Sequence, residues 1–232
     1  MTITAIIPAA GRGTRMGAPV AKQFLELKGK PILHYTLEVF ERCGVVDSVV
    51  LVVPESDVES ARRDWNKPGR CVRGVVAGGA QRQDSVWNGL HALDPDTEIV
   101  IVHDGVRPFV TEAILRNSVE TAREFGAALA AVPVSDTLKQ ADSEHWVTRT
   151  VDRRGLWRVQ TPQTFRLPLL IEAFEKAYAD SYYGTDEGSL VEYLGQPVKI
   201  VEGSELNIKI TRREDLALGE MILESRTPRP NG

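Results

Sequence analysis

The segment Thr2-Ile3-Thr4-Ala5-Ile6-Ile7-Pro8-Ala9-Ala10-Gly11-Arg12-Gly13-Thr14-Arg15-Met16-Gly17 joins an apolar run to a glycine-rich loop. The run has the composition of a buried strand, and the small residues after it let backbone N–H groups approach phosphate oxygens. A loop in this place lies at the carboxyl edge of a parallel sheet, where α/β proteins bind ligands. Arg12, Arg15 and Lys22 all precede the first acidic residue, Glu26. The stretch therefore predicts a site for a polyanion such as a triphosphate.

The glycine spacing argues against two familiar phosphate loops. The dinucleotide-binding pattern G-x-G-x-x-G needs its third glycine at Met16, but Gly17 comes one residue later. The P-loop pattern G-x-x-x-x-G-K-[ST] is missing from this stretch. From the loop alone, the remaining alternative is a glycine-rich turn with solvated arginines.

Short β-branched runs alternate with longer helical patterns along the rest of the chain. The expected strands are 2–7, 48–53, 72–76, 98–102, 127–132 and 198–201. The expected helices are 31–42, 57–66, 84–93, 111–124, 168–179, 186–194 and 212–224. Near-continuous apolar strands separated by helices predict an α/β fold with a doubly wound, mostly parallel Rossmann-like sheet. We expect one domain over residues 1–226 and a disordered tail at 227–232.

A polar stretch interrupts this alternation between residues 135 and 160. Apolar and polar residues roughly alternate from Trp146 to Val151, which predicts an exposed β-ribbon. A two-stranded ribbon that carries Trp146, Leu156 and Trp157 has little stability by itself. We therefore expect residues 135–160 to form an extended β-arm for dimerisation, with a solvated surface hairpin as the alternative.

The overall composition is that of an ordinary globular protein. The net charge of −4 argues against binding nucleic acid through a basic surface. The two cysteines, Cys43 and Cys71, form no C-x-x-C pair, and we expect them to be structural. Because we find no signal-peptide pattern and no apolar run of membrane-spanning length, we expect a cytoplasmic protein that does not contact a membrane.

Nine motifs in order identify a resemblance to a known family. They are Pro8-Ala9-Ala10-Gly11-x-Gly13-x-Arg15-Met16, Lys22-Gln23-Phe24, Gly78-Gly79-x-x-Arg82-x-Asp84-Ser85-Val86, Val102-His103-Asp104-x-x-Arg107-Pro108, Asp136-Thr137-Leu138-Lys139, Thr150-Val151-Asp152-Arg153, Thr161-Pro162-Gln163-x-Phe165, Thr185-Asp186-Glu187 and Asn207-Ile208-Lys209-Ile210-Thr211. Together they resemble the 2-C-methyl-D-erythritol 4-phosphate cytidylyltransferase family. The resemblance implies a Mg²⁺-dependent transfer of CMP from CTP to methylerythritol phosphate by a homodimer, in the non-mevalonate route to isoprenoid precursors.

The resemblance also assigns roles around the nucleotide. Arg15 and Lys22 match the family's transition-state stabilisers at the α-phosphate, and Asp104 matches its Mg²⁺ ligand. The expected nucleotide-binding residues are Ala9, Ala10, Gly11, Gly79, Ser85 and Asp104. Ser85 should help to read the cytosine, and it also suits a helix start.

A second group of residues matches the family's site for the acceptor substrate. Thr137, Arg153, Thr161 and Lys209 match the positions that hold methylerythritol phosphate, and Arg153 and Lys209 also count among the catalytic residues. Arg153 lies on the arm, so the resemblance implies that it reaches the partner subunit's active site. Arg107 is expected to fix Asp104 and its loop. The chain departs from the usual family pattern at Ala21, where proline is common, and at Gly105-Val106, where two alanines are common.

Three alternatives remain open at this point. Ribitol 5-phosphate cytidylyltransferase shares the transfer apparatus and differs chiefly in its acceptor. A nicotinamide-dependent oxidoreductase is opposed by the glycine spacing. A non-catalytic nucleotide-binding module would bind CTP yet release no pyrophosphate, and it would not need the cations and Asp104 together.

Overall fold

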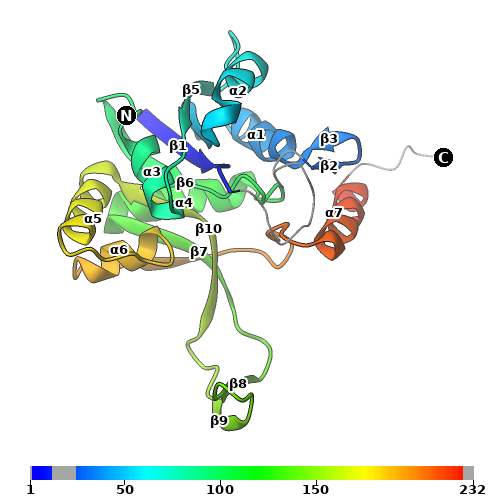
Figure 1. Ribbon diagram of the computed structural model, residues 1–232, viewed down its shortest axis with the longest axis vertical. Coiled ribbons are helices and arrows are strands. Elements are labelled where there is room, and N and C mark those ends of the chain that lie inside the picture. Colours follow the sequence, from blue (N-terminus) through cyan, green and yellow to red (C-terminus); the bar gives the residue numbers. More distant parts are fainter. Residues whose placement is uncertain (1, 12–24, 227–232) are drawn as a thin grey trace.

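A seven-stranded sheet forms the centre of the computed structural model, which describes residues 2–11 and 25–226 (Figure 1). The strand order is β11-β7-β10-β6-β1-β4-β5, and the neighbours are parallel except where β10 runs antiparallel to β6 and β7. These strands are β1 (Thr2–Pro8), β4 (Ser48–Val53), β5 (Val72–Ala77), β6 (Thr97–Val102), β7 (Ala127–Pro133), β10 (Trp157–Arg166) and β11 (Lys199–Glu202). The predicted mostly parallel α/β sheet is confirmed.

Helices cover both faces of this sheet, as a doubly wound fold requires. The helices are α1 (Ile32–Arg42), α2 (Val58–Trp65) after the short 3-10 helix η3 (Glu55–Asp57), α3 (Arg82–Leu90), α4 (Glu112–Phe125), α5 (Leu167–Ala179), α6 (Glu187–Tyr193) and α7 (Arg213–Arg226). The side chains of α1, α2 and α4 share one buried cluster with the strands, and those of α3, α5 and α6 share another. Alternate strand residues divide between the two clusters, with Ile7 in the first and Ile6 in the second.

A smaller third cluster joins the two-stranded hairpin of β2 (Glu26–Leu27) and β3 (Lys30–Pro31) to α7. Leu27, Phe109, Ile210 and Ile222 are buried in it. Ile210 N donates a hydrogen bond to Val106 O at 2.9 Å. The segment before α7 is thereby tied to the loop after β6, which becomes important for the site below.

Strand β10 was missing from our sequence prediction, although it lies in the middle of the sheet. Its residues 160–165 are buried, but four of them are the polar Gln160, Thr161, Gln163 and Thr164. Pro162 lies where the pairing with β7 is interrupted between Val159 and Gln163. A polar, proline-containing segment does not resemble an apolar strand, and residues 157–160, which we assigned to the arm, already belong to the sheet.

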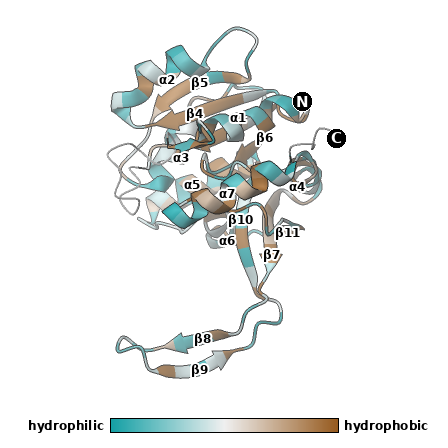
Figure 2. Ribbon diagram, turned by 90° about the vertical axis from the view of Figure 1, so that its right-hand side faces the viewer, coloured by the Kyte–Doolittle hydropathy of each residue, from teal (hydrophilic) through white to brown (hydrophobic). Residues whose placement is uncertain are grey.

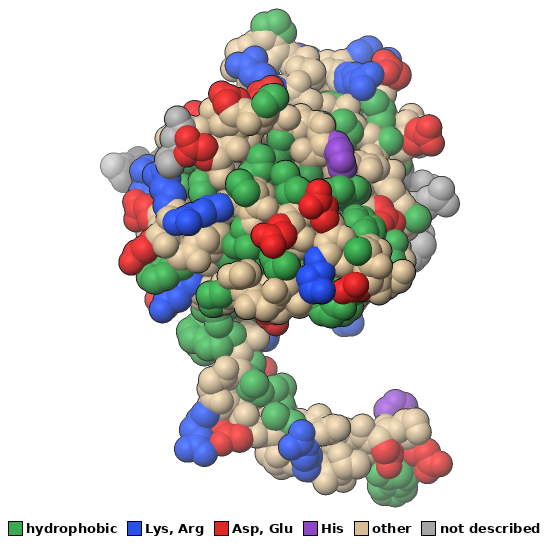
Figure 3. All heavy atoms as spheres, turned by 90° about the vertical axis from the view of Figure 1, so that its left-hand side faces the viewer, with side chains coloured by type: hydrophobic (Ala, Val, Ile, Leu, Met, Phe, Trp, Pro, Cys, Tyr) green, Lys and Arg blue, Asp and Glu red, His purple; other side chains and the backbone are tan. Residues whose placement is uncertain are grey.

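The predicted β-ribbon is present as the hairpin of β8 (Leu138–Ala141) and β9 (Val147–Val151), which extends from the body (Figures 1 and 2). Trp146 is 71% exposed at its end, and Trp157 is exposed near its base. Figure 3 shows hydrophobic side chains where the arm meets the body and charged side chains farther along it. Among the described residues, no helix is both long and apolar enough to cross a membrane.

Candidate active site

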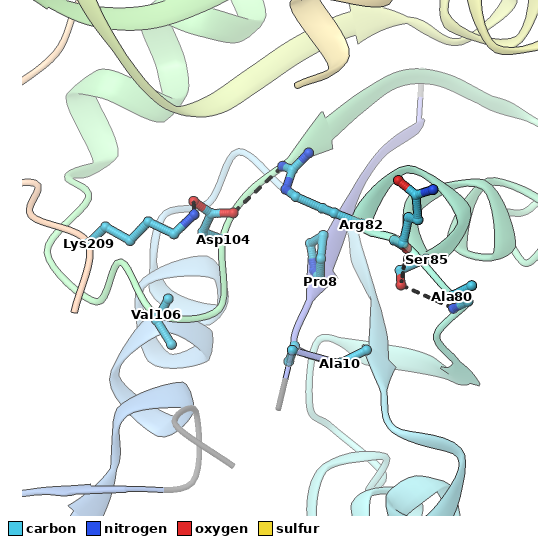
Figure 4. Close-up of a pocket in the computed structure, with 12 residues that line it drawn as sticks. Pro8, Ala10, Ala80, Arg82, Ser85, Asp104, Val106 and Lys209 are labelled. Atoms are coloured by element: carbon cyan, nitrogen blue, oxygen red, sulfur yellow. Dashed lines mark hydrogen bonds and ion pairs between the residues drawn. The ribbon is translucent and has the colours of Figure 1, made fainter. Parts of the chain in front are cut away.

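A cavity of about 450 Å³ opens at the carboxyl edge of the sheet, beside β1 and β6 (Figure 4). Its lining residues are Pro8, Ala9, Ala10, Gly11, Gly79, Ala80, Gln81, Arg82, Ser85, Asp104, Val106 and Lys209. The structure thus brings together seven predicted site residues that are far apart in the sequence. They are Ala9, Ala10, Gly11, Gly79, Ser85, Asp104 and Lys209.

Backbone hydrogen bonds continue past the strand ends and hold the loops of this cavity together. Ala9 N donates to Val52 O at 2.7 Å, and Gly105 N donates to Pro8 O at 3.3 Å. The loop after β1 is therefore fixed between its two neighbours in the sheet, with the small residues at 9–11 facing the cavity. Such a loop leaves room for a ligand to approach the backbone closely.

Glycine is required at two positions in the loop after β5. A Cβ on Gly78 would lie 2.4 Å from the Ala10 Cβ, and a Cβ on Gly79 would lie 2.3 Å from the Asp84 Cβ. These distances are far shorter than any van der Waals contact. Gly78 thus lets the loop after β5 pack directly against the loop after β1, and Gly79 lets it pack against the first turn of α3.

Ser85 occupies a different place in helix α3 from the one we expected. The helix begins at Arg82, and Gln81 precedes it as the N-cap residue, with Gln81 N donating to Asp84 Oδ2 at 2.9 Å. The expected helix-start role of Ser85 is therefore wrong, because Ser85 lies one turn inside the helix. Its Oγ accepts from Gly79 N at 3.1 Å and donates to Gln81 O at 3.0 Å, so that it braces the loop from within.

Three cations surround the carboxylate of Asp104, which lies in the loop after β6. Lys209 Nζ lies 2.9 Å and Arg107 Nε 3.4 Å from Asp104 Oδ2, while Arg82 approaches Oδ1 at 3.6 Å. Burial opposes ionisation of Asp104, but the charges of Arg82, Lys209 and Arg107 outweigh it and hold its pKa well below the usual range. Asp104 is therefore a carboxylate at neutral pH.

His103 and Thr161 hold the backbone of Asp104 from behind. Thr161 Oγ1 accepts from Asp104 N at 3.1 Å and lies 3.1 Å from His103 Nδ1, while His103 Nε2 lies 3.0 Å from Arg107 O. Because a carbonyl only accepts, Nε2 carries the proton, and the Thr161 hydroxyl donates to Nδ1. Burial lowers the pKa of His103 to about 4, although the Arg107 carbonyl and Asp104 favour its protonated form. His103 is thus neutral, and both of its ring nitrogens are engaged.

Polar residues of β10 also fix the segment that carries Lys209. Gln160 Nε2 donates to Ser204 O at 2.8 Å, and Asn207 Nδ2 donates to Thr161 O at 2.8 Å. Arg107 NH1 also donates to Asn207 O at 2.8 Å, so Arg107 joins this segment to Asp104, which its Nε contacts at 3.4 Å. The buried polar groups of β10 therefore set the position of Lys209 relative to Asp104.

Three predicted site residues that the structure describes do not line this cavity. Thr161 is buried behind Asp104, whereas Thr137 and Arg153 are exposed at the base of the arm. Arg153 there donates a hydrogen bond to Ser135 O. The remaining predictions, Arg15 and Lys22, lie outside the described residues, as does the predicted tail.

Sequence reasoning missed two charged residues at the cavity. Arg82 lies in its wall and forms a 2.6 Å ion pair with Glu187, the first residue of α6. Both residues stood within motifs that we had noted, but neither was given a role. The signal that could have found them is a charged residue within a strongly matching motif.

The cavity lining contains an oxygen donor that suits the expected Mg²⁺. No group of three or more His, Cys, Asp or Glu side chains able to hold a metal occurs within residues 2–11 and 25–226. Asp104 is the acidic residue among those that line the cavity. One ionised carboxylate fits a Mg²⁺ ion that is otherwise held by substrate phosphates and water.

The doubly wound sheet and the cavity at its carboxyl edge place the chain among Rossmann-like α/β proteins with a nucleotide-type ligand site. The family model for 2-C-methyl-D-erythritol 4-phosphate cytidylyltransferase matches residues 3–225. This chain belongs to that family.

Individual relatives agree with the family match. The chain is similar to the 2-C-methyl-D-erythritol 4-phosphate cytidylyltransferase of Syntrophus aciditrophicus, with 47% identity over 98% of each chain. It is 49% identical to the enzyme of that name from Geobacillus kaustophilus, over 97% of this chain and 99% of the relative. The crystal structure of 4-diphosphocytidyl-2C-methyl-D-erythritol synthase from Anaerococcus prevotii superposes with a TM-score of 0.85 at 35% identity, over 96% of each chain.

Proposed function

We propose that this chain transfers CMP from CTP to 2-C-methyl-D-erythritol 4-phosphate in isoprenoid precursor biosynthesis. A phosphate oxygen of the acceptor forms a bond to the α-phosphorus of CTP. The bond from that phosphorus to the β-phosphate oxygen breaks, and pyrophosphate leaves with the electron pair. The observation that carries this proposal is the cavity with Asp104 and Lys209, in a chain that matches the family over residues 3–225.

The nucleotide is proposed to bind across the loops after β1 and β5. Backbone groups of Ala9, Ala10 and Gly11 would contact it on one side, and Gly79 and Ser85 would contact the cytosine on the other. The Ser85 hydroxyl already donates to Gln81 O, which supports a role in shaping the loop beside the base. Arg15 and Lys22 would stabilise the charge that develops at the α-phosphate.

The reaction needs no general base, because the acceptor phosphate is already an anion. The charged residues of the cavity wall are Arg82, Asp104 and Lys209, which suit electrostatic stabilisation of anions. His103 lies nearby, but its two ring nitrogens are engaged by Thr161 and Arg107. Catalysis would therefore depend on placing two mutually repelling anions and on stabilising the charge of the leaving group.

Asp104 is the residue proposed to hold Mg²⁺. When bound with CTP, the ion would neutralise phosphate charge and favour departure of pyrophosphate. Asp104 Oδ2 faces Lys209 and Arg107, while Oδ1 makes only the longer contact with Arg82 among the described residues. This leaves Oδ1 as the oxygen better placed for a cation.

The acceptor is proposed to bind between the cavity and the arm of a second subunit. Lys209 would contact its phosphate from the cavity, and Arg153 of the arm would do so across the dimer as a bidentate partner. Thr137 and Thr161 complete the proposed acceptor site. Since the Thr161 hydroxyl donates to His103, a contact with the acceptor would use its remaining oxygen lone pair. The cytoplasmic location stays a prediction.

Pyrophosphate release from CTP, measured in the presence of Mg²⁺, tests this function. The assay compares methylerythritol 4-phosphate with ribitol 5-phosphate, and the wild type with Lys22→Ala and the control Lys30→Ala on the β2–β3 hairpin. Turnover with methylerythritol phosphate alone, lost only in Lys22→Ala, is the expected result. Turnover with ribitol phosphate would keep the chemistry but replace the acceptor, and CTP binding without turnover would identify a binding module.

A further inference from the structure

The carboxylate of Glu187 is buried directly behind the wall of the cavity. Its side chain is 2% exposed, and Oε1 accepts from Arg82 NH1 at 2.6 Å. Buried carboxylates are uncommon unless they are paired, because desolvation is costly. Arg82 is that partner, and the guanidinium itself lies in the cavity wall.

The ion pair with Arg82 involves only one of the two carboxylate oxygens of Glu187. Within the described residues, Glu187 Oε2 has no hydrogen-bond partner, although it is buried. A fork-to-fork pair would have satisfied both oxygens with two amino groups of Arg82. Instead, NH1 of Arg82 contacts Glu187, and NH2 points to Asp104 at 3.6 Å (Figure 4). The guanidinium is thus held between two carboxylates at the cavity.

The backbone around Glu187 is held firmly against the sheet. Gln163 Nε2 donates to Asp186 Oδ2 at 2.8 Å, and Gly188 N donates to Gln163 Oε1 at 3.0 Å. A Cβ on Gly188 would lie 2.7 Å from the Leu129 Cδ1, so glycine at this position lets α6 lie close to β7. The carboxylate of Glu187 therefore projects from a rigid site.

Helix α3 is tied to the same region next to Arg82. Gln83 Nε2 donates to Tyr182 O at 3.2 Å, and Gly184 N donates to Gln83 Oε1 at 3.0 Å. The segment that leads into α6 and the helix that carries Arg82 are thereby fixed to each other. Glu187 and Arg82 meet because both of their backbones are anchored.

We infer that Glu187 is a positioning residue that holds Arg82 in place to bind a phosphate of the nucleotide. An unrestrained arginine side chain would lose rotamer entropy when it orders on a ligand. The ion pair with Glu187 imposes this order before CTP arrives. The inference rests on the proposed cytidylyl transfer, since it deepens the nucleotide site of that reaction.

Glu187→Gln tests the inference, with Glu192→Gln as a matched control on the exposed side of the same helix. We expect Glu187→Gln to raise the CTP KM about tenfold, because the amide oxygen holds the guanidinium less strongly than the carboxylate does. The KM for methylerythritol phosphate should stay within about twofold, and Glu192→Gln should match the wild type in both constants. Glu187→Asp keeps the charge but shortens the side chain, and it should give a smaller rise in the CTP KM.

A double-mutant cycle separates positioning from a merely structural role. In an Arg82→Gln background, adding Glu187→Gln should change the CTP KM by less than about twofold, because Glu187 then has no guanidinium to hold. A tenfold effect that persists in this background would overturn the inference. So would a lower Tm of Glu187→Gln with an unchanged CTP KM.

Calorimetric titration of CTP into the wild type and Glu187→Gln gives a readout that does not need turnover. A weaker CTP Kd in the variant supports the inference, and an equal Kd overturns it. Wild-type protein that binds CTP without releasing pyrophosphate would refute the proposed reaction instead. The two failures are therefore distinguishable.

Discussion

Lys209 Nζ lies 2.9 Å from Asp104 Oδ2, although the two residues belong to distant parts of the sequence. Asp104 follows β6, and Lys209 lies between β11 and α7. The side chain of Asp104 is only 10% exposed, whereas that of Lys209 is 37% exposed and lines the cavity. Lys209 is therefore oriented by a buried carboxylate while its ammonium group remains open to a ligand.

We expect Lys209→Met to lower kcat/KM for methylerythritol phosphate by about 10²- to 10³-fold, as loss of a preorganised electrostatic contact does. Steady-state pyrophosphate release measures this loss. Lys199→Met is the control, because Lys199 lies on β11 over the Phe125 ring and outside the cavity lining. Equal activity of Lys209→Met and the wild type would remove Lys209 from the catalytic residues.

Gly78→Ala should disturb the nucleotide site, since its Cβ would lie 2.4 Å from the Ala10 Cβ. The Ala10 Cβ cannot rotate away, because it is attached directly to the backbone. The backbone must therefore shift, at a cost of about 1–3 kcal/mol. We expect a lower Tm together with a higher CTP KM. Gly74→Ala is the matched control on the preceding strand, where a Cβ would lie 3.4 Å from Val50 and fit ordinary contact. Equal effects of the two variants would contradict this account.

The sequence predicted the parallel strands well, because the central ones are apolar runs buried on both faces, such as Val49 to Val53 in β4. It missed β10, because that strand is stabilised by specific polar contacts instead of apolar burial. Gln160 contacts the loop after β11, Thr161 contacts the loop after β6, and Gln163 contacts the start of α6. Such partners are set by the tertiary fold. No periodicity in the sequence encodes them.

The candidate site also contains residues that the sequence could predict and residues that it could not. Small loop residues and Asp104 could be predicted, because each follows a strand in a strongly matching motif. The motif could have drawn attention to Glu187, but its pairing with Arg82 could not be predicted, since that pairing depends on the packing of α6 beside α3. The hydrogen bonds of Ser85 with Gly79 and Gln81 could not be predicted either, because they depend on where helix α3 begins.

Gln160→Leu tests whether β10 organises the segment that carries Lys209. The substitution leaves the Ser204 carbonyl and the Asn207 amide without their Gln160 partners. We expect a loss of about 1–3 kcal/mol in the free energy of unfolding, measured by urea denaturation. The exposed Gln196→Leu should change this free energy by less than about 0.5 kcal/mol. A Gln160→Leu protein as stable as the wild type would show that these bonds contribute little.

His103 should make the protein less stable as the pH falls. Its pKa is lowered to about 4, mainly by burial, from the ordinary value of 6.5. Between these two values the unfolded chain binds a proton that the folded protein excludes, so acid favours unfolding. For one such group we expect a loss of about 2 kcal/mol between pH 7 and pH 5. His103→Gln should reduce this slope in urea denaturation without added divalent metal, and an unchanged slope would assign it to other groups.

Mixed dimers test whether the arm completes a neighbouring site. Arg153 is exposed near the base of the arm and is bonded there to Ser135 O, and it is not among the residues that line the cavity of its own chain. If Arg153 serves the partner, a dimer of one Lys22→Ala subunit and one Arg153→Ala subunit contains one site with both defects and one intact site. We therefore expect about half of the wild-type activity per dimer, although each homodimer is nearly inactive. Pyrophosphate release by heterodimers purified through two different affinity tags measures it.

The control for this experiment pairs Lys22→Ala with Lys209→Met, because both of these residues are proposed to act within one chain. A heterodimer of these two variants has one defect in each site and should stay nearly inactive. Recovery with Arg153→Ala but not with Lys209→Met would thus assign Arg153 to the opposite subunit. If neither heterodimer recovers, each chain must supply its own Arg153, and the arm would have to fold back toward its own cavity. A rise in activity in both would instead place Lys209 across the interface, which its 2.9 Å contact with Asp104 of the same chain opposes.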